Sequence, residues 1–146
     1  RVRDKRVRVR GDTLSCPSFT ERARVGAGAE RWNRFHPEAK APRKAGVTQL
    51  LEGRQGPAIA ATDYVRTFAN QVREFVPMRY SVLGTDGYGR SDTRANLRRH
   101  FEVDRFHVAP AAVAALAADG KLTAKDVARA IKLYKLDAEK PNPLGV

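Results

Sequence analysis

Residues 79–104, RYSVLGTDGYGRSDTRANLRRHFEVD, decide the fold of this chain. Their apolar start, residues 80–83, places aromatic and β-branched residues beside turn formers and predicts a short buried strand. Gly84, Gly87 and Gly89 follow within six positions, and glycine permits the tight turn or close approach that redirects a strand into a helix. The stretch therefore predicts a strand, a glycine-rich turn and a helix in succession.

The helix after the glycines is predicted to begin at a polar pair. Ser91 is a favourable N-cap, and Asp92 places a carboxylate in the first turn, where the helix dipole stabilises negative charge. Leu97 and Phe101 stand four positions apart and form the apolar side of this helix. Its arginines are candidates for contact with an anion or an acidic partner, or they form a solvated face: Arg90, Arg94, Arg98 and Arg99.

A second strand is predicted at residues 58–61, ahead of Thr62 and Asp63 as alternative helix caps. Residues 63–76 place their apolar side chains on one helical face and are expected to form a single helix that Pro77 ends. A strand, a helix and a second strand in this order imply a parallel pair in one sheet. The expected class is therefore α/β.

The segments before this unit are expected to be less regular. Ser18 and Glu21 fit a capping box, but Gly26 and Gly28 offer an exit from the helix within two turns. Residues 29–58 are expected to be mostly irregular, apart from one helical turn near residues 47–52.

An aromatic cluster stands out in this irregular region: Trp32, Phe35 and His36, followed by Pro37. Large side chains in a connection usually pin a loop to the surface of the domain. The alternative is an exposed anchor for a partner, because tryptophan is favoured at interface hot spots.

Beyond the glycine turn, two further helices are predicted. Asp104 is expected to cap the first, which ends at Gly120. Pro110 should kink that helix or delay its start, because proline lacks a backbone donor and clashes with the carbonyl four residues back. Residues 123–126 resemble a capping box for the second helix, and two prolines in residues 141–143 predict an extended tail.

Length and charge narrow the classes of protein. The chain has 146 residues, enough for one domain with an ordinary core. Its net charge of +12 suggests a polyanion partner and leaves a small nucleic-acid-binding module as an alternative function. Residues 1–10 hold six basic residues and one acidic residue, and this concentration of charge in a head expected to be disordered weakens the alternative.

Motifs for catalysis or metal binding are not evident. His36, His100 and His107 lack the i, i+4 spacing of a metal pair, and the sequence has no Walker loop, dinucleotide fingerprint or nucleophile elbow. The single Cys16 suits a reducing cytosol, and no apolar run is long enough to span a membrane. We therefore expect no catalytic, cofactor-binding or metal-binding residue in this chain and a cytoplasmic location.

Residues 83–94 and 97–104 closely resemble one family, the C-terminal, transketolase-like domain of the homodimeric bacterial pyruvate dehydrogenases, the decarboxylating first component of the pyruvate dehydrogenase complex. Further matches in the right order lie at residues 18–21, 30–33 and 60–64 and run forward to Pro143, so the resemblance covers residues 16–146. Residues 1–15 do not resemble the family, and Pro110 stands where the family has an aliphatic residue.

The resemblance implies a three-layer α/β/α domain at residues 16–146 with a small, mostly parallel sheet, expected to be truncated at its N-terminus. It marks residues 1–15 as a basic head of uncertain origin, disordered or out of register. The whole enzyme would use thiamine diphosphate and Mg²⁺, held between its first two domains, to decarboxylate pyruvate and acetylate lipoyl groups. This chain lacks the Gly-Asp-Gly cofactor signature. The resemblance therefore implies a structural, dimer-supporting domain without catalytic residues.

The implied partners are the other domains of the same enzyme, a second subunit and the dihydrolipoyl acetyltransferase core of the complex. A membrane partner is not expected, and nucleic acid is disfavoured.

Overall fold

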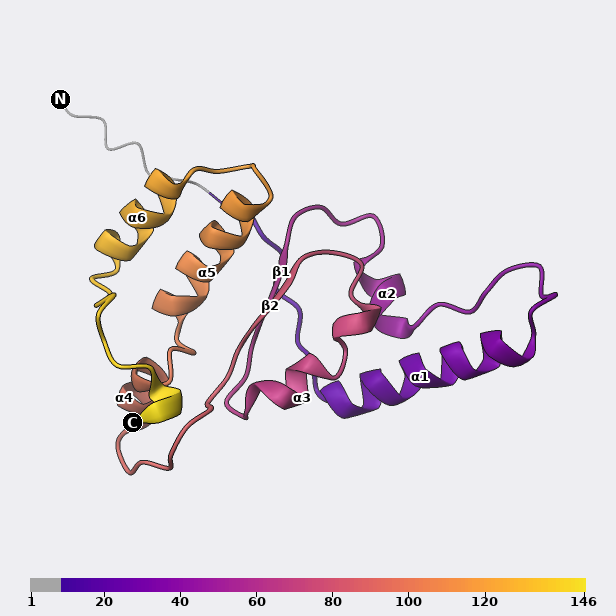
Figure 1. Ribbon diagram of the computed structural model, residues 1–146, viewed down its shortest axis with the longest axis horizontal. Helices are drawn as coiled ribbons and strands as arrows, with labels where there is room; N and C mark the ends of the chain where they lie inside the picture. The colour runs from indigo at the N-terminus through magenta and orange to yellow at the C-terminus, as the bar shows by residue number, and fades with distance from the viewer. Residues whose placement is uncertain (1–8) are drawn as a thin grey trace.

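The computed structural model of the protein describes residues 9–146 (Figure 1). Most of the basic head, which we expected to be disordered or out of register, lies outside the described residues. Residues 9–16 carry no regular secondary structure. The helices and strands follow in the order α1 (Phe19–Phe35), α2 (Gly46–Leu51), β1 (Ala58–Ala61), α3 (Arg66–Asn70), β2 (Tyr80–Leu83), α4 (Arg94–His100), α5 (Arg105–Ala118) and α6 (Ala124–Leu133). Two 3-10 turns, η1 (Arg73–Phe75) and η2 (Pro143–Gly145), complete the chain.

The sheet of the described chain consists of β1 and β2, which pair in parallel. The register aligns Ala58 with Tyr80 and Ala61 with Leu83. Both strands have the bounds that their apolar residues predict, and the parallel pairing implied by the strand-helix-strand order is confirmed. Their carboxyl ends therefore lie at one edge of the sheet, followed there by the glycine turn.

Helices cover the sheet on two sides (Figure 1). The hairpin of α5 and α6 lies on one side, where α5 packs on both strands, and α1, α2 and α3 lie on the other. This arrangement confirms the α/β class and the three layers. The buried apolar side chains come from both sides of the sheet: Ala45, Ala69, Val72, Phe75, Val103, Val113 and Ala115.

Tyr80 ties the sheet to the helix beside it. Its hydroxyl donates to the carbonyl of Ala69 in α3 at 2.9 Å, and burial raises the pKa of Tyr80 to about 12. The phenol therefore stays protonated and keeps this bond at physiological pH.

Helix α1 is longer than its two glycines predict. It is a 17-residue helix that passes through Gly26 and Gly28, so the expected early exit is wrong. Ser18 is confirmed as the N-cap, because its Oγ accepts from the Glu21 amide at 3.1 Å. Gly26 is a packing position and not a helix end, because it lies against the ring of Phe75, where any larger residue would be in the way.

The single helix expected at residues 63–76 is also wrong. Helix α3 covers only Arg66–Asn70, and η1 follows after a break. The buried positions Ala69, Val72 and Phe75 recur every three residues, which is the period of a 3-10 helix and not of an α-helix. The start is late because the carboxylate of Asp86, from the glycine turn, accepts the Arg66 amide at 3.1 Å and acts as the cap.

Helix α4 begins two residues later than Ser91 predicts. Its N-cap is Thr93, whose hydroxyl accepts from the Asn96 amide at 3.3 Å. Asp92 therefore precedes the helix, where its carboxylate accepts from the Thr93 amide and the Asn96 side chain. The cap moves because Asp92 has already formed its own turn with these donors.

Helix α5 has the two ends that its capping residues predict, and it contains Pro110. Asp104 is confirmed as the N-cap. Gly120, with φ +71°, ends the helix in a Schellman motif: the Gly120 amide donates to the Ala117 carbonyl, and the Lys121 amide donates to the Leu116 carbonyl. The helix starts directly at Arg105 and continues through the buried Pro110, so of the two outcomes expected from this proline the delayed start does not occur, and the kink stays a prediction.

The start of α6 and the C-terminal tail were also predicted from the sequence. The capping box of Thr123 and Asp126 is confirmed, with the carboxylate accepting from the Thr123 amide at 3.0 Å. The extended tail is wrong, because residues 143–145 form the turn η2 and Pro143 is buried. The Pro143 carbonyl faces Gly87 of the glycine turn and leaves no room there for a side chain.

Candidate functional site

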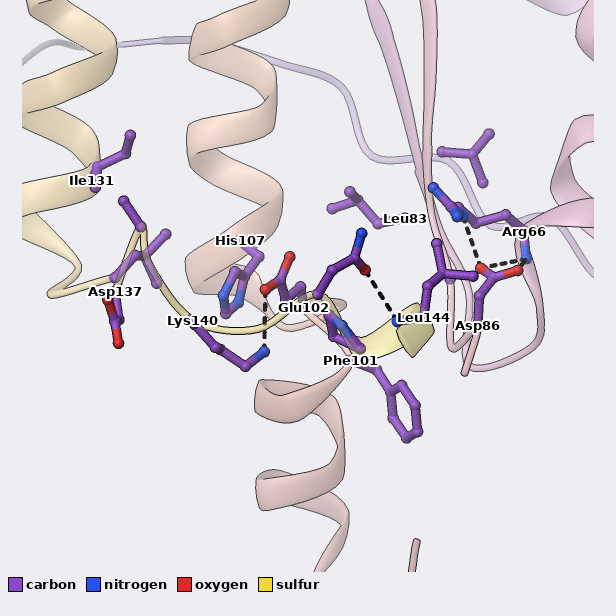
Figure 2. Close-up of a pocket in the computed structure, with 16 residues that line it drawn as sticks. Arg66, Leu83, Asp86, Phe101, Glu102, His107, Ile131, Asp137, Lys140 and Leu144 are labelled. Carbon is purple, nitrogen blue, oxygen red and sulfur yellow. Dashed lines mark hydrogen bonds and ion pairs between the residues drawn. The ribbon is translucent and has the colours of Figure 1, made fainter. Parts of the chain in front are cut away.

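A cleft of about 430 Å³ lies where the carboxyl end of β2 meets the glycine turn (Figure 2). This edge is where open α/β sheets usually bind ligands. The cleft is closed on its far side by the segment after α6. Its polar lining residues come from five parts of the chain: Arg66, Asp86, Glu102, His107, Asp137, Lys140 and Asn142.

An ion pair forms one wall of the cleft. The guanidinium Nε of Arg66 donates to Asp86 at 2.8 Å, and the same carboxylate accepts the Arg66 amide (Figure 2). Gly84 lies underneath, and a Cβ there would be 2.7 Å from the Arg66 amide nitrogen. The glycine turn therefore packs on the start of α3 while its aspartate caps that helix.

Glu102 and Lys140 form the opposite wall. Lys140 donates to the Glu102 carboxylate at 3.1 Å and to the carbonyl of His100, which ties the C-terminal segment to the end of α4. Glu102 has φ +62°, a left-handed conformation that costs a non-glycine residue roughly 1–2 kcal/mol. It occupies the position after the C-cap that glycine usually fills, so the lysine contact accompanies a strained helix end.

Asp104 and His107 form a further pair at the start of α5, and His107 lines the cleft. The His107 ring nitrogen is 2.7 Å from the Asp104 carboxylate, which also caps α5 through the amides of Phe106 and His107. Burial raises the pKa of Asp104, but the hydrogen bonds from His107 and the charge of Arg99 outweigh it and hold the pKa below its usual value. Asp104 therefore stays charged and structural.

Replacing Asp104 with alanine is expected to lower the free energy of unfolding by about 1–2 kcal/mol, the usual cost of losing an N-cap. Asparagine, which also caps helices, should retain most of the stability at pH 7. Because the carboxyl pKa is depressed in the folded state, the contribution of the charge is complete above about pH 4 and is lost as pH falls through that depressed value. Urea unfolding at several pH values measures this.

The difference in stability between the wild-type chain and Asp104→Asn should therefore shrink as the solution is acidified. A difference that stays constant from neutral to strongly acidic pH would contradict the assigned role of the charge.

His100 differs from the other ionisable groups near the cleft. Its Nε2 is buried without a hydrogen-bond partner in the described part of the chain, while its Nδ1 lies 3.5 Å from an Arg90 nitrogen. Loss of water around the ring lowers the pKa of His100, and the charges of Arg90 and Lys140 lower it further. A neutral imidazole packed edge-on against Phe101 is the result.

The four arginines singled out in the sequence do not share one partner. Arg94 and Arg98 meet at the Asp63 carboxylate, at 3.0 and 3.3 Å. Arg90 meets His100, and Arg99 donates to the carbonyls of the chain leaving α6. Part of the positive charge thus serves contacts within the domain, and a shared anion or partner contact stays a prediction.

These contacts also show which residues the sequence did not identify. They are Asp63, Asp86 and Lys140, which form ion pairs with Arg94, Arg66 and Glu102. The two residues of each pair are 20 or more positions apart in the chain, and no local sequence pattern marks such pairs. Only the position of Asp86 inside the glycine turn, at the carboxyl end of a predicted strand, is a usable signal.

The cleft supports packing more readily than catalysis. Its carboxylates at Asp86 and Glu102 are each paired with a cation, and residues 9–146 contain no cluster of three histidine, cysteine or acidic residues that could hold a metal ion. None of the described helices has the length and apolar character of a membrane span.

The chain matches the sequence profile of one family, described as the transketolase-like C-terminal domain, over residues 5–104. The match begins inside residues 1–15, which we placed outside the domain, so that boundary stays a prediction.

Several curated proteins are similar to this chain along most of its length. The chain is 56% identical over 138 residues to the pyruvate dehydrogenase E1 component of Cupriavidus necator, 53% over 134 residues to that of Pseudomonas aeruginosa, and 50% over 136 residues to that of Escherichia coli. These matches cover 91–94% of this chain but only 15% of each relative. The chain thus spans about one seventh of the length of the proteins it resembles.

Proposed function

The chain belongs to the transketolase-like C-terminal domain family, and we propose that it serves as that domain in a thiamine-diphosphate-dependent pyruvate dehydrogenase. The observation that carries the proposal is the 56% identity, over nearly the whole chain, to a pyruvate dehydrogenase E1 component. In the complete enzyme, pyruvate is decarboxylated and its acetyl group passes to a lipoyl group of dihydrolipoyl acetyltransferase. The enzyme works as a cytoplasmic homodimer.

The role of this domain is structural and supports the dimer. Its ionic residues favour this role, because Arg66–Asp86 and Glu102–Lys140 join the glycine turn, α3 and the C-terminal segment to one another. A charged pair that is already satisfied inside the domain is poorly placed to transfer protons during a reaction.

We infer that thiamine diphosphate and Mg²⁺ are held by other domains of the enzyme. The sequence supports this inference, because it lacks the Gly-Asp-Gly cofactor signature. The cleft supports it as well, because the carboxylates of Asp86 and Glu102 are each paired with a cation of the same domain.

A chimera tests this function. Residues 16–146 would replace the matching segment of the Escherichia coli E1 component, which is 50% identical. The chimera is expected to dimerise and to retain pyruvate-dependent activity, because the exchanged segment supplies packing and no reacting group. Activity is measured by pyruvate-dependent reduction of an artificial electron acceptor, and the dimer by analytical ultracentrifugation.

The control is the same Escherichia coli protein with the matching segment deleted, which should lose dimer stability and activity together. A chimera that forms the parent dimer and binds thiamine diphosphate but does not turn over pyruvate would contradict the proposal.

A further inference from the structure

The carboxyl end of α1 and the connection after it lead away from the sheet (Figure 1). We call residues 31–44 the α1 tip. Among the residues of α1, all of which the structure describes, Gly26 alone is buried, and it lies in the first half of the helix. The core of the domain therefore does not explain why the second half of α1 and its connection hold one conformation.

Interactions within the α1 tip fix its shape. The Asn33 amide donates to the Arg43 carbonyl at 2.9 Å and accepts the Arg43 amide at 2.7 Å, which folds the connection back on the helix. Trp32 stacks with the His36 ring, with the ring centroids 4.3 Å apart, and the Arg43 guanidinium lies over the Trp32 ring at 4.1 Å. A surface ordered before binding loses little entropy when a partner docks.

The surface that this arrangement presents has the composition of an interface. Phe35 is 63% exposed and carries the Arg31 guanidinium over its ring at 5.0 Å. Exposed aromatic rings combined with arginines and a tryptophan are typical of the residues that dominate binding energy. These exposed side chains support the second interpretation of the aromatic cluster, an exposed anchor for a partner.

Charge identifies the kind of partner. The α1 tip, residues 31–44, holds five basic residues and one acidic residue. Within residues 9–146, no carboxylate lies within ion-pair distance of Arg31, Arg34 or Arg43. An acidic surface would complete these charges, whereas the α1 tip of a second copy would bring like charges together.

We propose that the α1 tip docks on an acidic surface with an apolar centre, located in the part of the same enzyme polypeptide outside this chain. The inference rests on the proposed function. The curated relatives support this choice of occupant, because this chain matches only 15% of their length and most of such a polypeptide lies beyond it. Phe35 fills the apolar centre, and Arg31 and Arg34 pair with carboxylates around it.

Photocrosslinking in the purified full-length enzyme tests the proposal. Phe35 is replaced by p-benzoylphenylalanine, the enzyme is irradiated, and the linked peptides are identified by mass spectrometry. The expected product joins position 35 to an aspartate- or glutamate-rich segment of the same enzyme outside residues 1–146. In the Arg34→Glu background the yield should fall about tenfold, because a repelled contact replaces an attractive one.

The matched control is Lys125→Glu on α6, an exposed charge reversal away from the α1 tip, which should leave the yield unchanged. Linkage to the α1 tip of a second copy, absence of linkage, or a yield unaffected by Arg34→Glu would each overturn the inference. Pyruvate turnover by the same purified enzyme is measured in parallel. Turnover without the expected linkage leaves the proposed function standing and overturns only the docking surface.

Discussion

Replacing Gly87 with alanine is expected to destabilise the domain by about 3 kcal/mol or more, because two costs add at this position. Gly87 has φ +128°, a conformation that residues with a side chain rarely adopt. An added Cβ would also lie 2.1 Å from the Pro143 carbonyl oxygen, far inside contact distance. Urea unfolding followed by circular dichroism measures the loss.

Gly89, two residues further along the same turn, is the matched control. An added Cβ there meets no atom within 4 Å, so Gly89→Ala should change the free energy of unfolding by less than about 0.5 kcal/mol. In a chain that lacks residues 143–146, Gly87→Ala should cost less than it does in the full chain, because the clashing carbonyl is then absent. Equal effects at Gly87 and Gly89 would contradict the packing described for the turn.

Gly26 and Gly28 should respond to alanine with opposite signs. Both lie inside α1, where alanine is a better helix former than glycine by about 1 kcal/mol. At Gly26, however, an added Cβ would lie 2.4 Å from the ring of Phe75, which is only 7% exposed and cannot move aside easily. Gly26→Ala is therefore expected to destabilise the domain by about 1–3 kcal/mol despite the gain in helix propensity.

Gly28→Ala meets open space and should stabilise the domain by about 0.5–1 kcal/mol. Thermal and urea unfolding of both variants check the pair. A Phe75→Leu substitution should offset part of the Gly26→Ala loss, and the double-mutant cycle gives the size of that coupling. Stabilisation by alanine at Gly26 would contradict the close contact between α1 and Phe75.

The features that could be predicted from the sequence are those decided by neighbouring residues. The four residues of each strand, 58–61 and 80–83, are apolar runs between turn formers, and their bounds are confirmed. Asp104 caps α5 through amides two and three positions away, and Asp126 accepts from the amide of Thr123 three positions back, so a short pattern contains each interaction.

The predictions that were wrong concern features that depend on contacts with residues far along the chain. Gly26 and Gly28 read locally as a helix end, but Phe75, almost fifty positions away, requires a glycine in a continuing helix. Residues 63–76 read locally as one helix, but the cap comes from Asp86 across the sheet edge. Local propensity is a weak prior that such tertiary contacts override.

In the candidate site, too, the sequence predicted the local features and missed the contacts between distant residues. The glycine turn and the basic helix after it were located from the sequence, and the family resemblance came from the same residues. The partners of Arg94 and Arg98 at Asp63, and of Glu102 at Lys140, depend on the docking of α3 and of the C-terminal segment. A list of basic residues therefore gave the charge of this region but not its contacts.

The contact between Gly87 and Pro143 sets an order of events during protein synthesis. Pro143 is added 56 residues after Gly87, which at 5–20 residues per second takes roughly 3–11 s on the ribosome. Throughout that interval the nascent glycine turn lacks the segment that packs on it, although both strands have already been made. This part of the domain is thus expected to be the last to resist proteases during translation.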